Sequence, residues 1–119
     1  MTKRVLIVDD DRQMVRTLSD VVRLHGWEAQ GAYSGEEAVS SVEAQPFAIV
    51  LMDVRMDGMS GVDTLRAMKR LRPGIHVILM TAHTPGDVIA DAEREGARHV
   101  LRKPVPLPAL VEMLDAIVA

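Results

Sequence analysis

Short apolar runs and helix-like stripes alternate five times along the chain. Continuous runs rich in β-branched residues are typical of strands that a parallel sheet buries on both faces. The runs occupy residues 5–8, 27–32, 47–52, 75–80 and 98–102. The run at 27–32 is the most polar, so we expect it at an edge of the sheet, and the very apolar run at 47–52 is expected at its centre.

Each run is followed by a segment with helical spacing of apolar residues and with helix boundary signals. Residues suited to helix starts stand at Asp11, Ser34, Ser60, about Pro85 and Pro106. Predicted ends stand at His25–Gly26, Ala44, Arg72–Pro73 and Gly96, and the last helix runs to the end of the chain. Asp and Ser at these positions can accept a hydrogen bond from the first turn of a helix, and that turn tolerates Pro.

Strands that alternate with helices predict an α/β fold, in which a parallel sheet is covered by helices on both faces. Right-handed crossovers leave few topologies for such a chain. Ligands then bind at the carboxyl ends of the strands, where the strand order reverses. The residues that directly follow the strands are therefore the candidates for function.

Composition narrows the class of protein. The 119 residues suit one domain, 1–119, and 48% hydrophobic residues can form a core. A net charge of -3 and 3% aromatic residues argue against direct nucleic acid binding. There is no cysteine, no apolar run long enough for a membrane span and no signal peptide pattern. We expect a soluble, cytoplasmic domain.

Polar side chains stand where four of the predicted strands end. Asp9 and Asp10 follow the first strand, Asp53 the third, Thr81 the fourth and Lys103 the fifth. In a doubly wound sheet these ends lie side by side, which would bring carboxylates, a hydroxyl and an ammonium into one crevice. Neighbouring carboxylates repel each other unless a cation lies among them.

This set of groups favours phosphoryl transfer. Carboxylate oxygens without His or Cys suit Mg²⁺, while Thr81 and Lys103 supply donors for an anion beside the metal. Asp53 is the natural nucleophile and would form an acyl phosphate. Taken alone, Asp9 and Asp10 could equally be helix caps, and we interpret Asp11 as one.

Four motifs together resemble the receiver domain of two-component response regulators, over essentially the whole chain. They are VLIVDDD at 5–11, Asp53-x-x-Met56 with Gly61, Thr81-Ala82 and Lys103-Pro104. The resemblance implies a flavodoxin-like, doubly wound, five-stranded parallel sheet in the order 2-1-3-4-5. It also implies a phosphoacceptor that regulates an output and is not an enzyme with turnover.

The resemblance further implies roles for individual residues. Asp10, Asp53 and the main-chain carbonyl of Arg55 would bind Mg²⁺ directly, and Asp9 would act through water. Thr81 and Lys103 would hold the phosphoryl oxygens, and the Lys103–Pro104 peptide would be cis. The implied partners are a histidine kinase or phosphotransfer protein, an output domain in a longer chain, and a second copy in a phosphorylation-dependent homodimer.

The sequence departs from the family pattern at Asp57, where Pro is usual, at Val100, where an aromatic residue is common, and at Val105, where Phe is frequent. By resemblance, Arg55 and His83 flank the approach of water to the acyl phosphate. Both are large. We expect the permanently cationic Arg55 to lean across the phosphoryl group, to shield it and to make the acyl phosphate comparatively long-lived, whereas His83 could instead act as a base.

Two alternatives remain open at this point. Asp9-x-Asp11, Thr81 and Lys103 loosely resemble a haloacid-dehalogenase-type phosphatase, although Arg12 stands where Thr or Val is expected and no acidic pair follows Lys103. The chain is either a complete regulator or a piece of a longer protein, and we expect the latter.

Other residues receive a structural interpretation. The four histidines, His25, His76, His83 and His99, share no metal-ligand spacing. We interpret Lys69, Arg70 and Arg72 as a solvated helix end. Four methionines, Met52, Met56, Met68 and Met80, are expected in the core.

Overall fold

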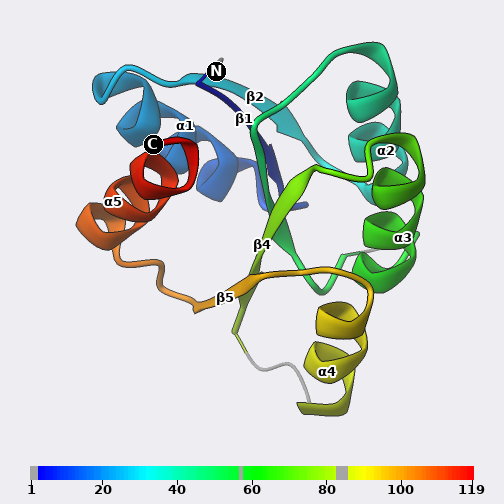
Figure 1. The fold of residues 1–119 in the computed structure, drawn as a ribbon. Coiled ribbons are helices and arrows are strands. Elements are labelled where there is room, and N and C mark those ends of the chain that lie inside the picture. Colours follow the sequence, from blue (N-terminus) through cyan, green and yellow to red (C-terminus); the bar gives the residue numbers. More distant parts are fainter. Residues whose placement is uncertain (1–2, 57, 83–85) are drawn as a thin grey trace.

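Strands and helices alternate along the chain in the computed structural model, which describes residues 3–56, 58–82 and 86–119 (Figure 1). The strands are β1 (Arg4–Val8), β2 (Glu28–Ala32), β3 (Ile49–Asp53), β4 (His76–Thr81) and β5 (His99–Arg102). The helices are α1 (Arg12–Leu24), α2 (Gly35–Ala44), α3 (Gly61–Leu71), α4 (Gly86–Arg94) and α5 (Leu107–Val118). All ten predicted elements are therefore present, with bounds within two residues wherever both bounds are described.

The predicted helix caps are confirmed. Side-chain oxygens of Asp11, Ser34 and Ser60 accept hydrogen bonds from the backbone N–H three residues further on, over 3.1 to 3.2 Å. Each cap satisfies a donor that the first turn of a helix leaves without an intrahelical partner. Pro106 precedes α5, as predicted. The predicted start of the fourth helix at Pro85 lies outside the described residues.

The five strands form one parallel sheet in the order β2-β1-β3-β4-β5. The predicted placement of β3 at the centre and of the polar strand β2 at an edge is confirmed. The chain passes from β1 to the edge strand β2 and then returns across β1 to β3. The strand order therefore reverses between β1 and β3, and this is where such folds bind ligands.

Helices cover both faces of the sheet (Figure 1). Alternate residues of β1 point to opposite faces, so Val5 and Ile7 pack with α1 and α5, whereas Leu6 and Val8 pack with α2, α3 and α4. The buried side of α1 contains Val15, Leu18 and Val22, whereas Val21 is only half-buried.

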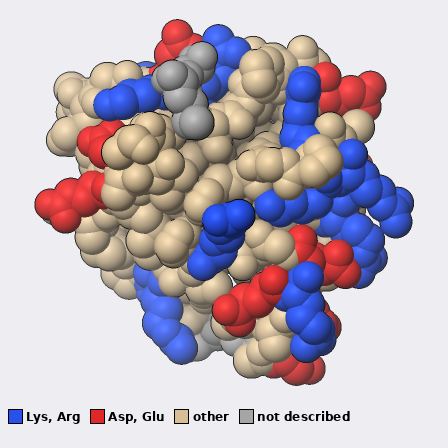
Figure 2. Space-filling view, in the orientation of Figure 1, with Lys and Arg blue, Asp and Glu red and all other residues tan. Residues whose placement is uncertain are grey.

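Basic and acidic side chains lie next to each other over α3 and α4, at the lower right of Figure 2. Arg66 of α3 pairs with Asp63 at 3.1 Å and with Glu95 at 3.0 Å, and Arg94 of α4 pairs with Asp91. Exposed pairs of this kind contribute little to stability. Among the described residues, no helix combines the length and apolar character that a membrane crossing requires.

Two histidines meet at the amino end of the sheet, which the sequence did not indicate. The rings of His76 and His99 stack with centroids 5.5 Å apart and planes 12° apart. Nε2 of His76 is buried and has no hydrogen-bond partner among the residues that the structure describes. Lys69 also departs from the expected solvated position, because it is half-buried and its Nζ donates to the carbonyl of Ile75 over 2.5 Å.

Burial lowers the pKa of His76 from 6.5, and the positive charges of Arg98 and Lys69, with His99, lower it further. Unfolding would restore the ordinary pKa, so the unfolded chain binds more protons than the folded chain below that value. The free energy of unfolding should therefore fall as the pH drops below about 6.5, and this loss levels off below the folded-state pKa.

We predict that His76→Phe, which keeps a flat ring against His99 but cannot be protonated, weakens this acid sensitivity. Thermal unfolding of the wild type and the variant between pH 7.5 and pH 5 measures it. The fluorescence of Trp27, which is 3% exposed and is the one tryptophan of the sequence, provides the signal. Equal loss of stability in both proteins would contradict the assignment to His76.

Candidate functional site

The register of the sheet brings the predicted site residues to one edge. Val8 of β1 pairs with Met52 of β3, so the next residue of each strand, Asp9 and Asp53, lies beside the other. On the other side of β3, Asp53 pairs with Met80, and the next residue of β4 is Thr81. Lys103 continues β5 and its N–H donates to the carbonyl of Thr81 over 2.8 Å. The crevice expected at the strand ends is therefore present.

Lys103 bridges two carboxylates. Its Nζ lies 2.7 Å from Oδ2 of Asp9 and 2.8 Å from Oδ2 of Asp53. The Asp9 side chain is 1% exposed, that of Asp53 12% and that of Lys103 18%. Water screens these charges little, so the ammonium strongly offsets the repulsion between the two carboxylates.

Burial and neighbouring charge shift the acid–base behaviour of this group. Burial raises the pKa of Asp9, and the nearby carboxylate of Asp53 adds to this, while Lys103 and the N–H of Asp11 oppose it. Burial alone would lower the pKa of Lys103, but its hydrogen bonds to Asp53 and Asp9 outweigh that effect and raise it. Lys103 is therefore held firmly in its charged form.

The other oxygens of these two carboxylates bind backbone donors. Oδ1 of Asp9 accepts from the N–H of Asp11 and Oδ1 of Asp53 from the N–H of Arg55, each over 3.0 Å. Both oxygens of each side chain are thus oriented by the protein. Asp11 itself caps α1, as expected, so of the acidic run only Asp9 and Asp10 take part in the crevice.

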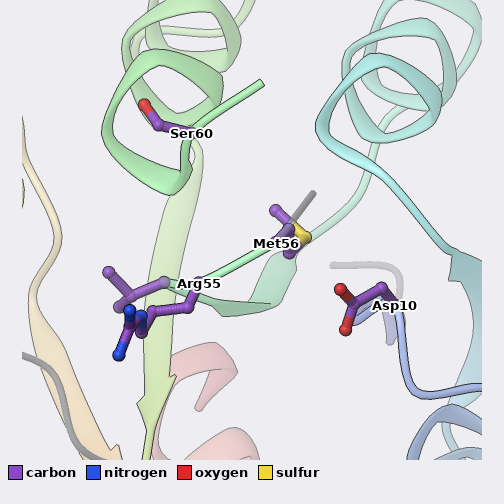
Figure 3. A pocket seen from close by; sticks show the side chains of 5 residues that line it. Asp10, Arg55, Met56 and Ser60 are labelled. Carbon is purple, nitrogen blue, oxygen red and sulfur yellow. The ribbon is translucent and has the colours of Figure 1, made fainter. Parts of the chain in front are cut away.

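Asp10 is exposed and borders a pocket of about 380 Å³ formed with Val54, Arg55, Met56 and Ser60. Figure 3 shows the carboxylate of Asp10 pointing toward Met56, and the side chain of Arg55 pointing away from Asp10. Met56 was expected in the core, but it is only half-buried, whereas Met52 is fully buried.

Three acidic residues lie close enough together to hold a hard cation. One oxygen from each of Asp9, Asp10 and Asp53 lies within 4.8 Å of the others. Carboxylate oxygens without nitrogen or sulfur ligands fit Mg²⁺ or Ca²⁺ better than zinc or copper. Asp10 is exposed, whereas the oxygens of both Asp9 and Asp53 already have protein donors as partners, so a cation could contact Asp10 without displacing one of these donors.

Two further expectations concern single positions. The Lys103–Pro104 peptide bond is cis, as the resemblance implied. Val105, where the family often has Phe, is buried against the α1–α5 side of the sheet, and Val100 packs against the opposite side. Asp57 and His83, the two other positions singled out from the sequence, lie outside the described residues.

A contact that the sequence did not indicate joins α2 to the segment after β3. Oε1 of Glu36 accepts a hydrogen bond from the backbone N–H of Met59 over 3.0 Å. The two residues are 23 positions apart, and no periodic pattern links them. In the sequence, Glu36 is an ordinary acidic residue of the first turn of a helix, a position in which the helix dipole favours negative charge.

The fold and the crevice define a doubly wound α/β domain with a carboxylate–lysine site, and comparison with known proteins identifies its family. The family model of the response regulator receiver domain matches residues 5–115. The chain therefore belongs to the response regulator receiver domain family. The sequence resemblance is thereby confirmed, and no similarity to a haloacid-dehalogenase-type phosphatase supports the alternative.

Individual relatives and solved structures agree with this family assignment. The transcriptional regulatory protein ZraR of Salmonella typhimurium is 36% identical over 97% of this chain, which spans 26% of ZraR. The chemotaxis protein CheY of Thermotoga maritima is 33% identical over 98% of both chains. A CheY-like receiver domain of Methanospirillum hungatei superposes with a TM-score of 0.92 at 28% identity, over 99% of this chain and 98% of that one. The chain thus spans about a quarter of one curated relative and nearly all of another.

We predict that Lys103→Ala binds Mg²⁺ at least about threefold more tightly, because the ammonium competes with a cation for oxygens of Asp9 and Asp53. Titration calorimetry of the purified protein measures this affinity. Arg102→Ala is the matched control, since it removes the same charge from an exposed neighbouring position. Equal affinities in the two variants would show that Lys103 does not compete for this site.

Proposed function

We propose that Asp53 accepts a phosphoryl group from a phosphohistidine of a histidine kinase or phosphotransfer protein. The observation that supports this most directly is the position of its carboxylate. Asp53 ends the central strand, its Oδ2 lies 2.8 Å from Nζ of Lys103, and oxygens of Asp9 and Asp10 lie within 4.8 Å. A buried strand holds such a nucleophile in a fixed orientation, and this lowers the entropy cost of bringing the reacting groups together.

The residues that would hold Mg²⁺ are Asp10, Asp53 and the main-chain carbonyl of Arg55, with Asp9 acting through water. Bound there, Mg²⁺ would offset the negative charge that the carboxylates and an incoming phosphoryl group bring together. Asp9 would remain in place through its bonds to Lys103 and to the N–H of Asp11. The choice of Mg²⁺ over Ca²⁺ follows from the need to leave coordination positions for water and phosphate.

In the proposed step, a carboxylate oxygen of Asp53 attacks phosphorus while the bond from phosphorus to the donor's imidazole nitrogen breaks. The imidazole leaves with the electron pair and takes up a proton. Lys103, already charged, would then donate to a phosphoryl oxygen, and Thr81 at the end of β4 would donate to another. The protein would act on itself once and not turn over.

The proposed partners extend beyond this chain. ZraR is a transcriptional regulatory protein of which the chain matches only part, so we propose that an output domain or a separate protein reads the phosphorylated state. A phosphorylation-dependent homodimer is a second route to an output, and a cytoplasmic location would give access to the kinase. This domain itself would not bind nucleic acid.

We predict that acetyl phosphate with Mg²⁺ adds one phosphoryl group to the wild type and none to Asp53→Asn. Intact-mass measurement detects the addition. Asp11→Asn is the control, because Asn also caps helices and Asp11 lies outside the acidic group. Equal labelling of Asp53→Asn and wild type would reject the assignment, and continuous hydrolysis of a phosphate ester would point to a phosphatase.

We predict that Arg55→Ala loses the phosphoryl group faster than wild type, by up to about fivefold, the equivalent of a surface ion pair of about 1 kcal/mol. Arg55 is exposed beside Asp53 and can lean across the acyl phosphate and shield it from water. The decay of phosphorylated protein is followed by mass measurement, with Arg102→Ala as the control for net charge. Slower loss in Arg55→Ala would show that Arg55 assists hydrolysis.

A further inference from the structure

The segment from Val54 to Ser60 joins the proposed phosphoacceptor strand to α3, and its two ends are closed against each other. A Cβ atom added to Gly61 would lie 2.5 Å from the carbonyl oxygen of Val54 and 2.9 Å from its Cα. Only glycine permits that approach, so Gly61 brings the start of α3 against the residue after Asp53. Val54, after β3, and Gly61, at the start of α3, therefore lie against each other.

The outer part of this segment is held by α2. Oε1 of Glu36 accepts the N–H of Met59 over 3.0 Å. Gly58 has a φ of 82°, a left-handed conformation that glycine adopts without strain, and a Cβ there would come within 3.2 Å of Glu36 Oε2. The neighbouring Gly35 also packs on Met59, since its Cβ would lie 3.0 Å from Cβ of Met59.

Glu36 is not needed to cap its own helix. Ser34 accepts the N–H of Glu37 and caps the helix, and the carboxylate of Glu37 accepts the N–H of Tyr33, the residue before the cap, over 2.6 Å. Glu36 is exposed and buries little surface. Its carboxylate instead binds the backbone of the distant Met59, next to Gly58, in the segment that follows Asp53 and Arg55.

We infer that Glu36 is a positioning residue that holds the segment after β3, and thereby the carbonyl of Arg55, in the geometry that a divalent cation requires. This inference rests on the proposed function, because it assigns Arg55 to the metal. Without the bond to Met59, the outer part of the segment would sample more conformations, and cation binding would have to order it. The effect should therefore be seen in cation affinity more than in overall stability.

The test compares Glu36→Ala, Glu36→Gln and Glu37→Ala by calorimetric titration with Mg²⁺ and by thermal unfolding without Mg²⁺. Glu36→Ala should weaken Mg²⁺ binding at least about threefold, in line with the loss of one hydrogen bond to a charged acceptor. Glu36→Gln keeps an acceptor oxygen and should stay within about twofold of wild type. Glu37→Ala should lower the unfolding temperature, because it loses the bond from the N–H of Tyr33 at the start of α2, but should leave the affinity unchanged.

Three results would overturn the inference. Unchanged affinity in Glu36→Ala would show that the bond to Met59 does not position the site. Equal weakening in Glu36→Gln and Glu36→Ala would assign the effect to charge, and equal weakening in Glu37→Ala would assign it to the stability of α2. A wild type that binds Mg²⁺ and is phosphorylated on Asp53 separates these outcomes from failure of the proposed function; a wild type that does neither rejects both.

Discussion

The rest of the site depends on one cation placed between two buried carboxylates. Lys103 contacts Asp9 and Asp53 from the end of β5, and both contacts are shorter than 3 Å. Without a positive charge in that position, two carboxylates this close and this deeply buried would repel each other, and protonation of one of them would be favoured. The parallel sheet makes the contact possible, because it brings residues 94 and 50 positions apart to one edge.

The same contact explains how the site could respond to a ligand. Lys103 satisfies the carboxylates while they have no other partner, and its flexible stem lets the ammonium move to a newly arrived phosphoryl oxygen nearby. Asp9 and Asp53 are also bound to the backbone N–H groups of Asp11 and Arg55, so they would keep their orientation as the ammonium moves. The carboxylates are thus held in place where the proposed chemistry would occur, and the compensating charge of Lys103 is the part that could move.

Strand ends and helix starts could be predicted from the sequence, because they have local signals: β-branched runs, capping side chains and a polar residue after each buried run. That was enough to bring Asp53 and Lys103 together. Contacts without a local signal could not be predicted. The hydrogen bond between Glu36 and Met59 and the stack of His76 on His99 depend on how α2 and the strands pack. The local sequence around an acidic first turn or a lone histidine is the same whether or not such a contact forms.

The most direct test of this account is a crystal structure of the protein with Mg²⁺ and beryllofluoride, a mimic of the phosphoryl group. The account predicts beryllium bonded to a carboxylate oxygen of Asp53 and Mg²⁺ on Asp10 and the carbonyl of Arg55. It also predicts that Nζ of Lys103, now 2.8 Å from Asp53, turns to a fluorine atom. Beryllofluoride on another side chain, or Lys103 still bridging Asp9 and Asp53 with the mimic in place, would contradict it.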